Sequence, residues 1–169
     1  MLGIFHDYFT IFKKLIFQVI SFAYDIRSNI RQGSNVEIKQ LKNITKNMSL
    51  LYVEDNKFLS RANMQLFEDI FLQVDLAEDG KSGLDLYQKN AYDLVIADIN
   101  LPKMNGLVML KNILNYNANQ PVIVVSAYSE IEYLSKLQEL KIEYFLTKPV
   151  NSKKIISSIY QSVKKLEVV

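Results

Sequence analysis

From Ser49 onward the sequence alternates short apolar runs with longer amphipathic segments, and this alternation occurs five times. Parallel strands joined by helices are covered on both faces, so they read as continuous apolar runs. The pattern therefore predicts an α/β fold with three layers, in which helices cover both faces of a five-stranded parallel sheet. The strands are expected at residues 49–53, 74–77, 92–97, 121–125 and 142–146, and the helices at 56–71, 81–89, 106–115, 129–140 and 151–166.

The composition excludes several classes of protein. The 169-residue chain is 49% hydrophobic and 22% charged, so it can bury a core and is not a disordered chain. It has no cysteine, which excludes disulfide frameworks, thiolate metal sites and a cysteine nucleophile. A single histidine argues against a histidine-rich metal site or a Ser-His-Asp triad. The net charge of +2 is too small to indicate a protein that binds nucleic acid.

The charge is distributed unevenly along the chain. Residues 1–48 carry seven Lys and Arg against three Asp and Glu, a net charge of +4. Residues 49–169 carry thirteen against fifteen, a net charge of −2. Because this change coincides with the start of the first expected strand, we predict an N-terminal helical extension with a linker over 1–48 and an α/β domain over 49–169.

Polar side chains follow four of the predicted strands at the point where each strand ends. Glu54 and Asp55 follow the first strand, Asp98 the third, Ser126 the fourth and Lys148 the fifth. Sites in open parallel sheets form beyond the carboxyl ends of the strands, so these groups should converge on one rim. Helix capping or solvation in a loop would explain any one of these residues, but it explains the whole set poorly.

The chemistry of this set points to phosphoryl transfer. Clustered carboxylates repel one another unless a cation neutralises them, and oxygen ligands without histidine or cysteine suit a hard cation, Mg²⁺ or Mn²⁺. A carboxylate can also act as a nucleophile and form an aspartyl phosphate. A metal, a lysine and a hydroxyl would then hold the phosphoryl oxygens. The residues therefore predict metal-assisted phosphoryl transfer to Asp98.

The chain resembles the receiver domain of two-component response regulators. The resemblance covers residues 49–167 in order and with family-like spacing. It implies the flavodoxin-like strand order 2-1-3-4-5. It also implies a phosphorylation-controlled signalling switch that accepts a phosphoryl group from a sensor histidine kinase or a phosphotransfer protein and acts through protein contacts. The matching motifs are Glu54-Asp55, Asp98-Ile-Asn-Leu-Pro-Lys-Met-Asn-Gly106, Ser126-Ala127 and Thr147-Lys148-Pro149.

The resemblance implies a role for each matching residue. Asp98 would be the phosphoacceptor, and Lys148 would pair with the phosphoryl group. Asp55 and Asp98 would bind Mg²⁺ directly, together with the backbone carbonyl of Asn100, and Glu54 would contribute through water. Such a receiver is not an enzyme in the ordinary sense, although it takes part in its own phosphorylation and dephosphorylation.

The resemblance also implies a switch near the fifth strand. Ser126 would hydrogen-bond the phosphoryl group, and Phe145 stands where the family often has tyrosine. The Phe145 ring can still move inward behind Ser126, but it has no hydroxyl to engage a partner. Strand alternation places the adjacent Tyr144 on the opposite face of the sheet. Pro149 is expected to follow a cis peptide bond.

Three other functions stay open from the sequence. A phosphorelay shuttle and an interaction module that does not depend on phosphorylation would use the same fold. A metal-dependent phosphatase with an aspartyl-phosphate intermediate is a further alternative. Such enzymes typically carry a second acid two residues after the nucleophile, but this chain has Asn100 there, which cannot transfer a proton.

The N-terminal segment predicts an amphipathic helix over residues 1–24. Its longest uncharged stretch, residues 15–24, is ten residues long, whereas a membrane span needs about 20. A signal peptide is a poor fit because the charges lie in the middle of the segment, so we predict a cytoplasmic protein, with membrane association as an alternative. The wide apolar face favours a homodimer, and the alternatives are a membrane surface, another partner, or packing on the chain's own domain. Residues 27–35 are expected to form a linker, and 36–48 a short second helix.

Overall fold

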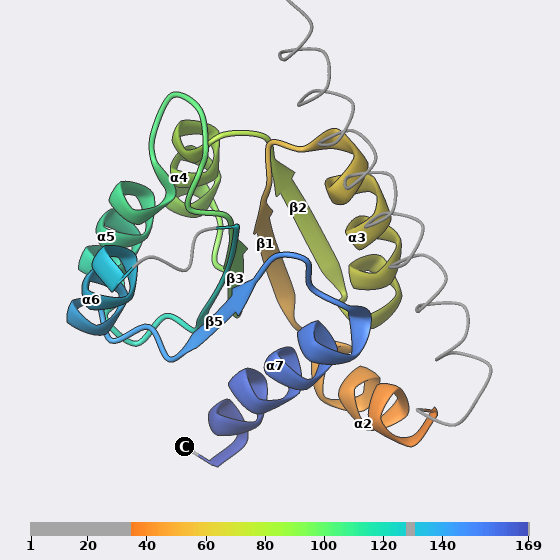
Figure 1. Ribbon diagram of the computed structural model, residues 1–169. Coiled ribbons are helices and arrows are strands. Elements are labelled where there is room, and N and C mark those ends of the chain that lie inside the picture. The colour runs from red at the N-terminus through yellow and green to blue at the C-terminus, as the bar shows by residue number, and fades with distance from the viewer. Residues whose placement is uncertain (1–34, 128–130, 169) are drawn as a thin grey trace, which may run out of the picture.

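The structure is a computed structural model that describes residues 35–127 and 131–168. The amphipathic helix predicted at residues 1–24 lies outside the described residues, as does nearly all of the predicted linker. The described part of the chain forms a parallel sheet with helices on both faces (Figure 1). Among the described residues, we find no helix with the length and apolar character needed to cross a membrane.

The sheet has five strands in the order β2-β1-β3-β4-β5. All four pairings between neighbouring strands are parallel. The predicted strand order is therefore confirmed, and the direction of winding reverses between β1 and β3, where ligand sites form in sheets of this kind. The strands are β1 (Ser49–Val53), β2 (Gln73–Ala77), β3 (Leu94–Ala97), β4 (Val122–Ser126) and β5 (Tyr144–Thr147).

Helices follow the strands in alternation, as predicted. In four of them an Asn or Asp side chain caps the first turn by accepting a backbone N–H. The capping residues are Asn56, Asp79, Asn105 and Asn151. The helices are α2 (Asn35–Thr45), α3 (Lys57–Ile70), α4 (Gly80–Lys89), α5 (Gly106–Tyr116), α6 (Ile131–Glu139) and α7 (Ser152–Lys164), and a short 3₁₀ helix, η1 (Lys165–Val168), follows α7.

The fifth strand begins two residues later than its apolar run suggested. The backbone N–H groups of Lys141 and Ile142 donate to carbonyls at the end of α6, at 2.9 Å in both cases. Lys141 adopts a left-handed conformation with φ 56°, which is typical of the residue that closes a helix. Ile142 is therefore used to end α6, and β5 starts at Tyr144.

The core consists of two apolar layers, one on each face of the sheet. One layer joins the sheet to α2, α3 and α7, and the other joins it to α4, α5 and α6 (Figure 1). Successive residues of β1 alternate between the layers, with Leu50 and Tyr52 in the first and Leu51 and Val53 in the second. Both faces of the central strands are thus buried, which explains their continuous apolar sequence.

Helix α2 packs on the main body of the fold. Its Leu41 side chain is fully buried in the layer formed with α3 and α7. The buried Thr45 hydroxyl donates to the carbonyls of Leu41, at 2.9 Å, and Ile70. The helix expected at residues 36–48 is present, and it shares the core of the α/β domain. The division of the chain at residue 48 stays a prediction.

Candidate functional site

The carboxyl ends of β1, β3 and β5 bring three charged side chains together. Glu54, Asp98 and Lys148 each follow a strand and extend its hydrogen-bonding pattern by one residue. The Glu54 amide donates to Ala77 at 3.0 Å, the Asp98 amide to Val53 at 3.0 Å, and the Lys148 amide to the carbonyl of Ser126 at 2.8 Å. Because the sheet fixes these backbones, the side chains leave the same edge in fixed directions.

Lys148 bridges two carboxylates at the centre of the site. Its Nζ lies 2.7 and 3.0 Å from the two Glu54 carboxylate oxygens and 2.6 Å from Asp98 Oδ2. Glu54 is 2% exposed and Asp98 is 6% exposed, so both acids are largely removed from water. Buried charges are costly unless they are paired, and one ammonium group here serves two carboxylates.

Burial and pairing act in opposite directions on these groups. Burial raises the pKa of Glu54, even though Lys148 opposes the shift. Burial alone would lower the pKa of Lys148, but the negative charges of Glu54 and Asp98 raise it overall. The lysine therefore stays charged, while the buried Glu54 would be stabilised in its ionised form by a further positive charge.

Asp55 completes an acidic cluster on the solvent side. Carboxylate oxygens of Glu54, Asp55 and Asp98 all lie within 4.8 Å of one another, and Asp55 is the exposed member. A set of hard oxygen ligands without nitrogen or sulfur suits Mg²⁺. The exposed position of Asp55 opens the cluster to solvent. The residues present therefore fit a divalent cation.

The loop after β3 holds the Asp98 carboxylate in place. The Asn100 amide donates to Asp98 Oδ1 at 3.0 Å, while Lys148 contacts the other oxygen. The loop then returns closely to β3, because the Gly106 amide donates to the Ile99 carbonyl at 2.8 Å. A Cβ atom on Gly106 would lie 2.1 Å from the Asp98 carbonyl oxygen, so a side chain at this position would push the loop away from the site.

An ion pair ties the same loop to α4. Lys103 adopts a positive φ of 62°, and its Nζ lies 2.6 Å from Asp79 Oδ2. The other Asp79 oxygen caps α4 by accepting the Ser82 amide at 2.8 Å. The hydrogen bond from Lys103, supported by the Ser82 amide, lowers the pKa of Asp79 to about 2. The sequence analysis missed this clamp, although an Asp before a Gly and a helical segment is a recognisable capping signal.

The remaining predicted residues lie at the ends of β4 and β5. Ser126 is fully buried at the last position of β4. Phe145 is half-buried and packs against the layer of α4, α5 and α6, whereas Tyr144 packs against the opposite layer, as strand alternation predicted. The peptide bond between Lys148 and Pro149 is cis, as expected.

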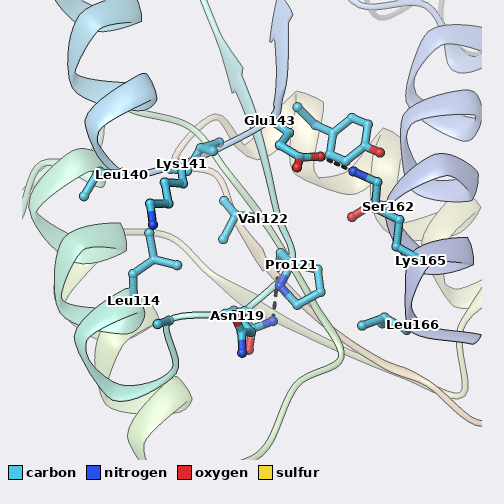
Figure 2. Close-up of a pocket in the computed structure, with 14 residues that line it drawn as sticks. Leu114, Asn119, Pro121, Val122, Leu140, Lys141, Glu143, Ser162, Lys165 and Leu166 are labelled. Atoms are coloured by element: carbon cyan, nitrogen blue, oxygen red, sulfur yellow. Dashed lines mark hydrogen bonds and ion pairs between the residues drawn. The ribbon is translucent and has the colours of Figure 1, made fainter. Parts of the chain in front are cut away.

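A separate hollow of about 300 Å³ lies at the other end of the sheet (Figure 2). It is lined from the end of α5, the starts of β4 and β5, and the end of α7 with η1. Its charged groups are Glu143 and Lys165, which form an ion pair, and Lys141, which also lines the hollow. Glu143 is the one carboxylate in this lining, so the hollow does not reproduce the acidic cluster. We therefore place the candidate site at the carboxyl ends of the strands.

Comparison with known proteins gives consistent matches to one family. Residues 50–160 match the family described as "Response regulator receiver domain". The chain is 36% identical over 112 residues to the transcriptional regulatory protein DltR of Streptococcus agalactiae, a match that spans 66% of this chain and 50% of DltR. It is 32% identical over 118 residues to the chemotaxis protein CheY of Treponema pallidum, spanning 68% of this chain and 82% of CheY. The chain thus spans about half the length of DltR and most of CheY.

Solved structures show the same fold. A CheY-like response regulator receiver domain from Methanospirillum hungatei aligns with a TM-score of 0.69 at 22% identity, covering 73% of this chain and 98% of that one. The N-terminal domain of an uncharacterized protein from Wolinella succinogenes aligns with a TM-score of 0.66 at 32% identity, covering 72% of this chain and 97% of that one. The strand order of the sheet and the similarity to known proteins therefore point to the same family.

Proposed function

The chain belongs to the response regulator receiver family, and we propose that it is a phosphorylation-controlled switch in which Asp98 accepts the phosphoryl group. The observation that supports this most is the bridge from Lys148 Nζ to Asp98 and Glu54 at the carboxyl ends of the strands. The bridge joins the expected acceptor, a metal-site acid and a cation in one cluster.

We propose that Asp55 and Asp98 hold Mg²⁺ directly with the Asn100 carbonyl, while Glu54 contributes through water; Mn²⁺ has the same ligand preferences. When bound, the cation would neutralise the carboxylates and the charge of the incoming phosphoryl group. The exposed Asp55 gives it access from solvent. We further propose that the donor is a histidine kinase or a phosphotransfer protein, and that the output passes through protein contacts.

Asp98, Lys148 and Ser126 each have a different role in the proposed transfer step. An oxygen of the Asp98 carboxylate attacks phosphorus, a P–O bond forms, and the bond from phosphorus to the donor nitrogen or oxygen breaks. The leaving group keeps the electron pair of the broken bond. Lys148 is close enough to Asp98 to donate to a phosphoryl oxygen on it. Ser126 supplies a hydroxyl at the end of β4, and its hydrogen bond to the phosphoryl group would couple phosphorylation to movement of Phe145.

Labelling with a small phosphodonor tests this proposal. The full chain with Mg²⁺ and acetyl phosphate should gain one acid-stable, alkali-labile phosphoryl group, measured by intact mass, and omission of Mg²⁺ should prevent it. Asp98→Asn should gain none. Asp93→Asn is the matched control, because Asp93 lies at the other end of β3 and accepts the Ser49 amide at 2.7 Å. Labelling that persists in Asp98→Asn would move the nucleophile elsewhere.

A further inference from the structure

A buried tyrosine lies beside the acidic cluster. Tyr52 is in β1, two residues before Glu54, and is 2% exposed. Its ring packs edge-on against Phe67, with 5.1 Å between the ring centroids. The other buried side chains of β1, Leu50, Leu51 and Val53, are aliphatic. A phenol placed among them needs a partner for its hydroxyl.

The hydroxyl has a donor from α3, and Tyr52 lines a small cavity together with Glu54. Asn63 Nδ2 donates to the Tyr52 hydroxyl at 2.6 Å. The hydroxyl oxygen thus acts as an acceptor toward Asn63, which leaves its own proton for another group. Burial raises the pKa of Tyr52 well above its ordinary value, and the negative charge of Glu54 raises it further. The phenol therefore stays protonated beside a carboxylate.

Packing alone does not fix the Glu54 carboxylate on this side. A cavity of about 30 Å³ lies among Tyr52, Glu54, Asn63 and Lys148, with Val150 and Ile155 on its apolar wall. This volume has room for one or two water molecules. With open space beside it, the orientation of the carboxylate depends on its hydrogen bonds.

We propose that Tyr52 and Asn63 are positioning residues, in which Asn63 orients the Tyr52 hydroxyl and the hydroxyl donates to Glu54 across the small cavity that the two residues line. In the structure, Glu54 accepts hydrogen bonds from Lys148 and, at a long 3.3 Å, from the Asn56 amide. Lys148 also contacts Asp98, where a phosphoryl group would compete for it. Tyr52 keeps the buried carboxylate oriented toward the cation whichever partner Lys148 takes. This inference rests on the proposed function for its metal.

Tyr52→Phe in the full chain is the direct test, because it removes only the hydroxyl. Titration calorimetry with Mg²⁺ should show a dissociation constant raised about 10-fold, the lower range for loss of an outer-shell partner. Tyr92→Phe is the matched control, since Tyr92 is also a buried residue and its hydroxyl donates to an Asp75 carboxylate oxygen at 2.5 Å. Its Mg²⁺ affinity should equal that of the wild type.

A spectroscopic readout separates positioning from loss of structure. Mg²⁺ changes the charge beside Tyr52, so the wild type and Tyr92→Phe should show a near-ultraviolet tyrosine difference spectrum that Tyr52→Phe lacks. Asn63→Leu should weaken Mg²⁺ binding less than Tyr52→Phe does. The double variant Tyr52→Phe/Asn63→Leu should bind Mg²⁺ about as weakly as Tyr52→Phe alone, since the two residues act as a unit. Urea unfolding with a chelator present measures the stability of each variant separately.

The outcomes distinguish this inference from the proposed function. If the wild type binds Mg²⁺ and Tyr52→Phe binds it within twofold of the wild type, the positioning role is overturned alone. A difference spectrum that survives in Tyr52→Phe also overturns it. If the wild type binds no Mg²⁺, the proposed metal site fails and this inference fails with it.

Discussion

The two ends of the sheet both carry lysine–carboxylate pairs, but in opposite surroundings. At the carboxyl end, Lys148 is 14% exposed and serves two buried acids. At the amino end, Lys165 and Glu143 are 60% and 62% exposed and pair one to one. Water screens the second pair, so it contributes little to stability. Around Lys148, burial and an excess of negative charge create a cluster that a bound cation would stabilise.

Replacing the lysine at each end should give the largest contrast. Lys148→Met leaves Glu54 and Asp98 buried without their shared cation, so the free energy of unfolding should fall by about 3 kcal/mol at neutral pH. Lys165→Met should leave it unchanged within error. Urea unfolding measures both variants. Equal losses at the two ends would contradict the contrast in burial.

The pH dependence of the Lys148→Met loss sharpens this comparison. The pKa of Glu54 is raised in the folded protein, so Glu54 takes up a proton more readily there than in the unfolded chain. A protonated Glu54 no longer needs the lysine. The loss in Lys148→Met should therefore shrink as the pH falls through the acid range, and a loss independent of pH would argue against an uncompensated Glu54.

Metal affinity should divide the acids by position. Asp55→Asn should raise the Mg²⁺ dissociation constant more than Glu54→Gln does, because only Asp55 is proposed to bind the cation directly. Both substitutions should raise the dissociation constant more than Glu143→Gln, because Glu143 lies at the amino end of the sheet and its replacement should have no effect. Titration calorimetry gives the three constants, and equal losses for Asp55→Asn and Glu54→Gln would contradict the assignment.

Loss of the clamp between α4 and the loop after β3 should cost less. Asp79→Ala removes the helix cap and the partner of Lys103, so the free energy of unfolding should fall by about 1–2 kcal/mol. Asp85→Ala, which breaks the exposed pair with Lys81, is the control and should cause no measurable change. An equal effect of the two variants would mean that the clamp is only a surface ion pair.

Asp79 also predicts a pH window for stability. Its pKa is lowered to about 2 in the folded protein, below the value of about 3.9 in an unfolded chain. Its contribution is therefore complete above about pH 4 and is lost as the pH falls toward 2. Asp79→Ala should remove this part of the acid-induced loss, and chemical unfolding at several pH values measures it.

The smallest expected effect on stability is that of Asp98→Asn without metal. Two carboxylates in close contact repel by about 4 kcal/mol at an effective dielectric near 20, but Lys148 already offsets much of this for Asp98. The free energy of unfolding should therefore stay within about 1 kcal/mol of the wild type, or rise. A large fall would give Asp98 a structural role in addition to its proposed chemical one.

The sequence was sufficient for the fold because the central strands, which are covered on both faces, read as continuous apolar runs. It also located the ends of the strands, and therefore Glu54, Asp98 and Lys148. It placed the starts of the third and fifth strands two residues too early, and at the fifth the reason is that the N–H of Ile142 is used to end α6. Apolar character does not show which backbone groups a neighbouring helix will use.

The contacts that the sequence did not predict join residues from different elements. The Asp79–Lys103 pair depends on the left-handed backbone at Lys103, a conformation that Lys rarely adopts. Tyr52 resembles any aromatic residue of a buried strand until Asn63 is seen to donate to its hydroxyl. Such contacts depend on tertiary packing, which periodicity and spacing do not specify.

The central claim is that Asp98 carries the phosphoryl group, and chemical mapping tests it most directly. Borohydride reduces an aspartyl phosphate to homoserine, so the full chain is incubated with Mg²⁺ and acetyl phosphate, reduced, digested and sequenced by mass spectrometry. We predict homoserine at position 98 and unmodified Asp at positions 55 and 93. Homoserine at another position, with Asp98 intact, would contradict the account.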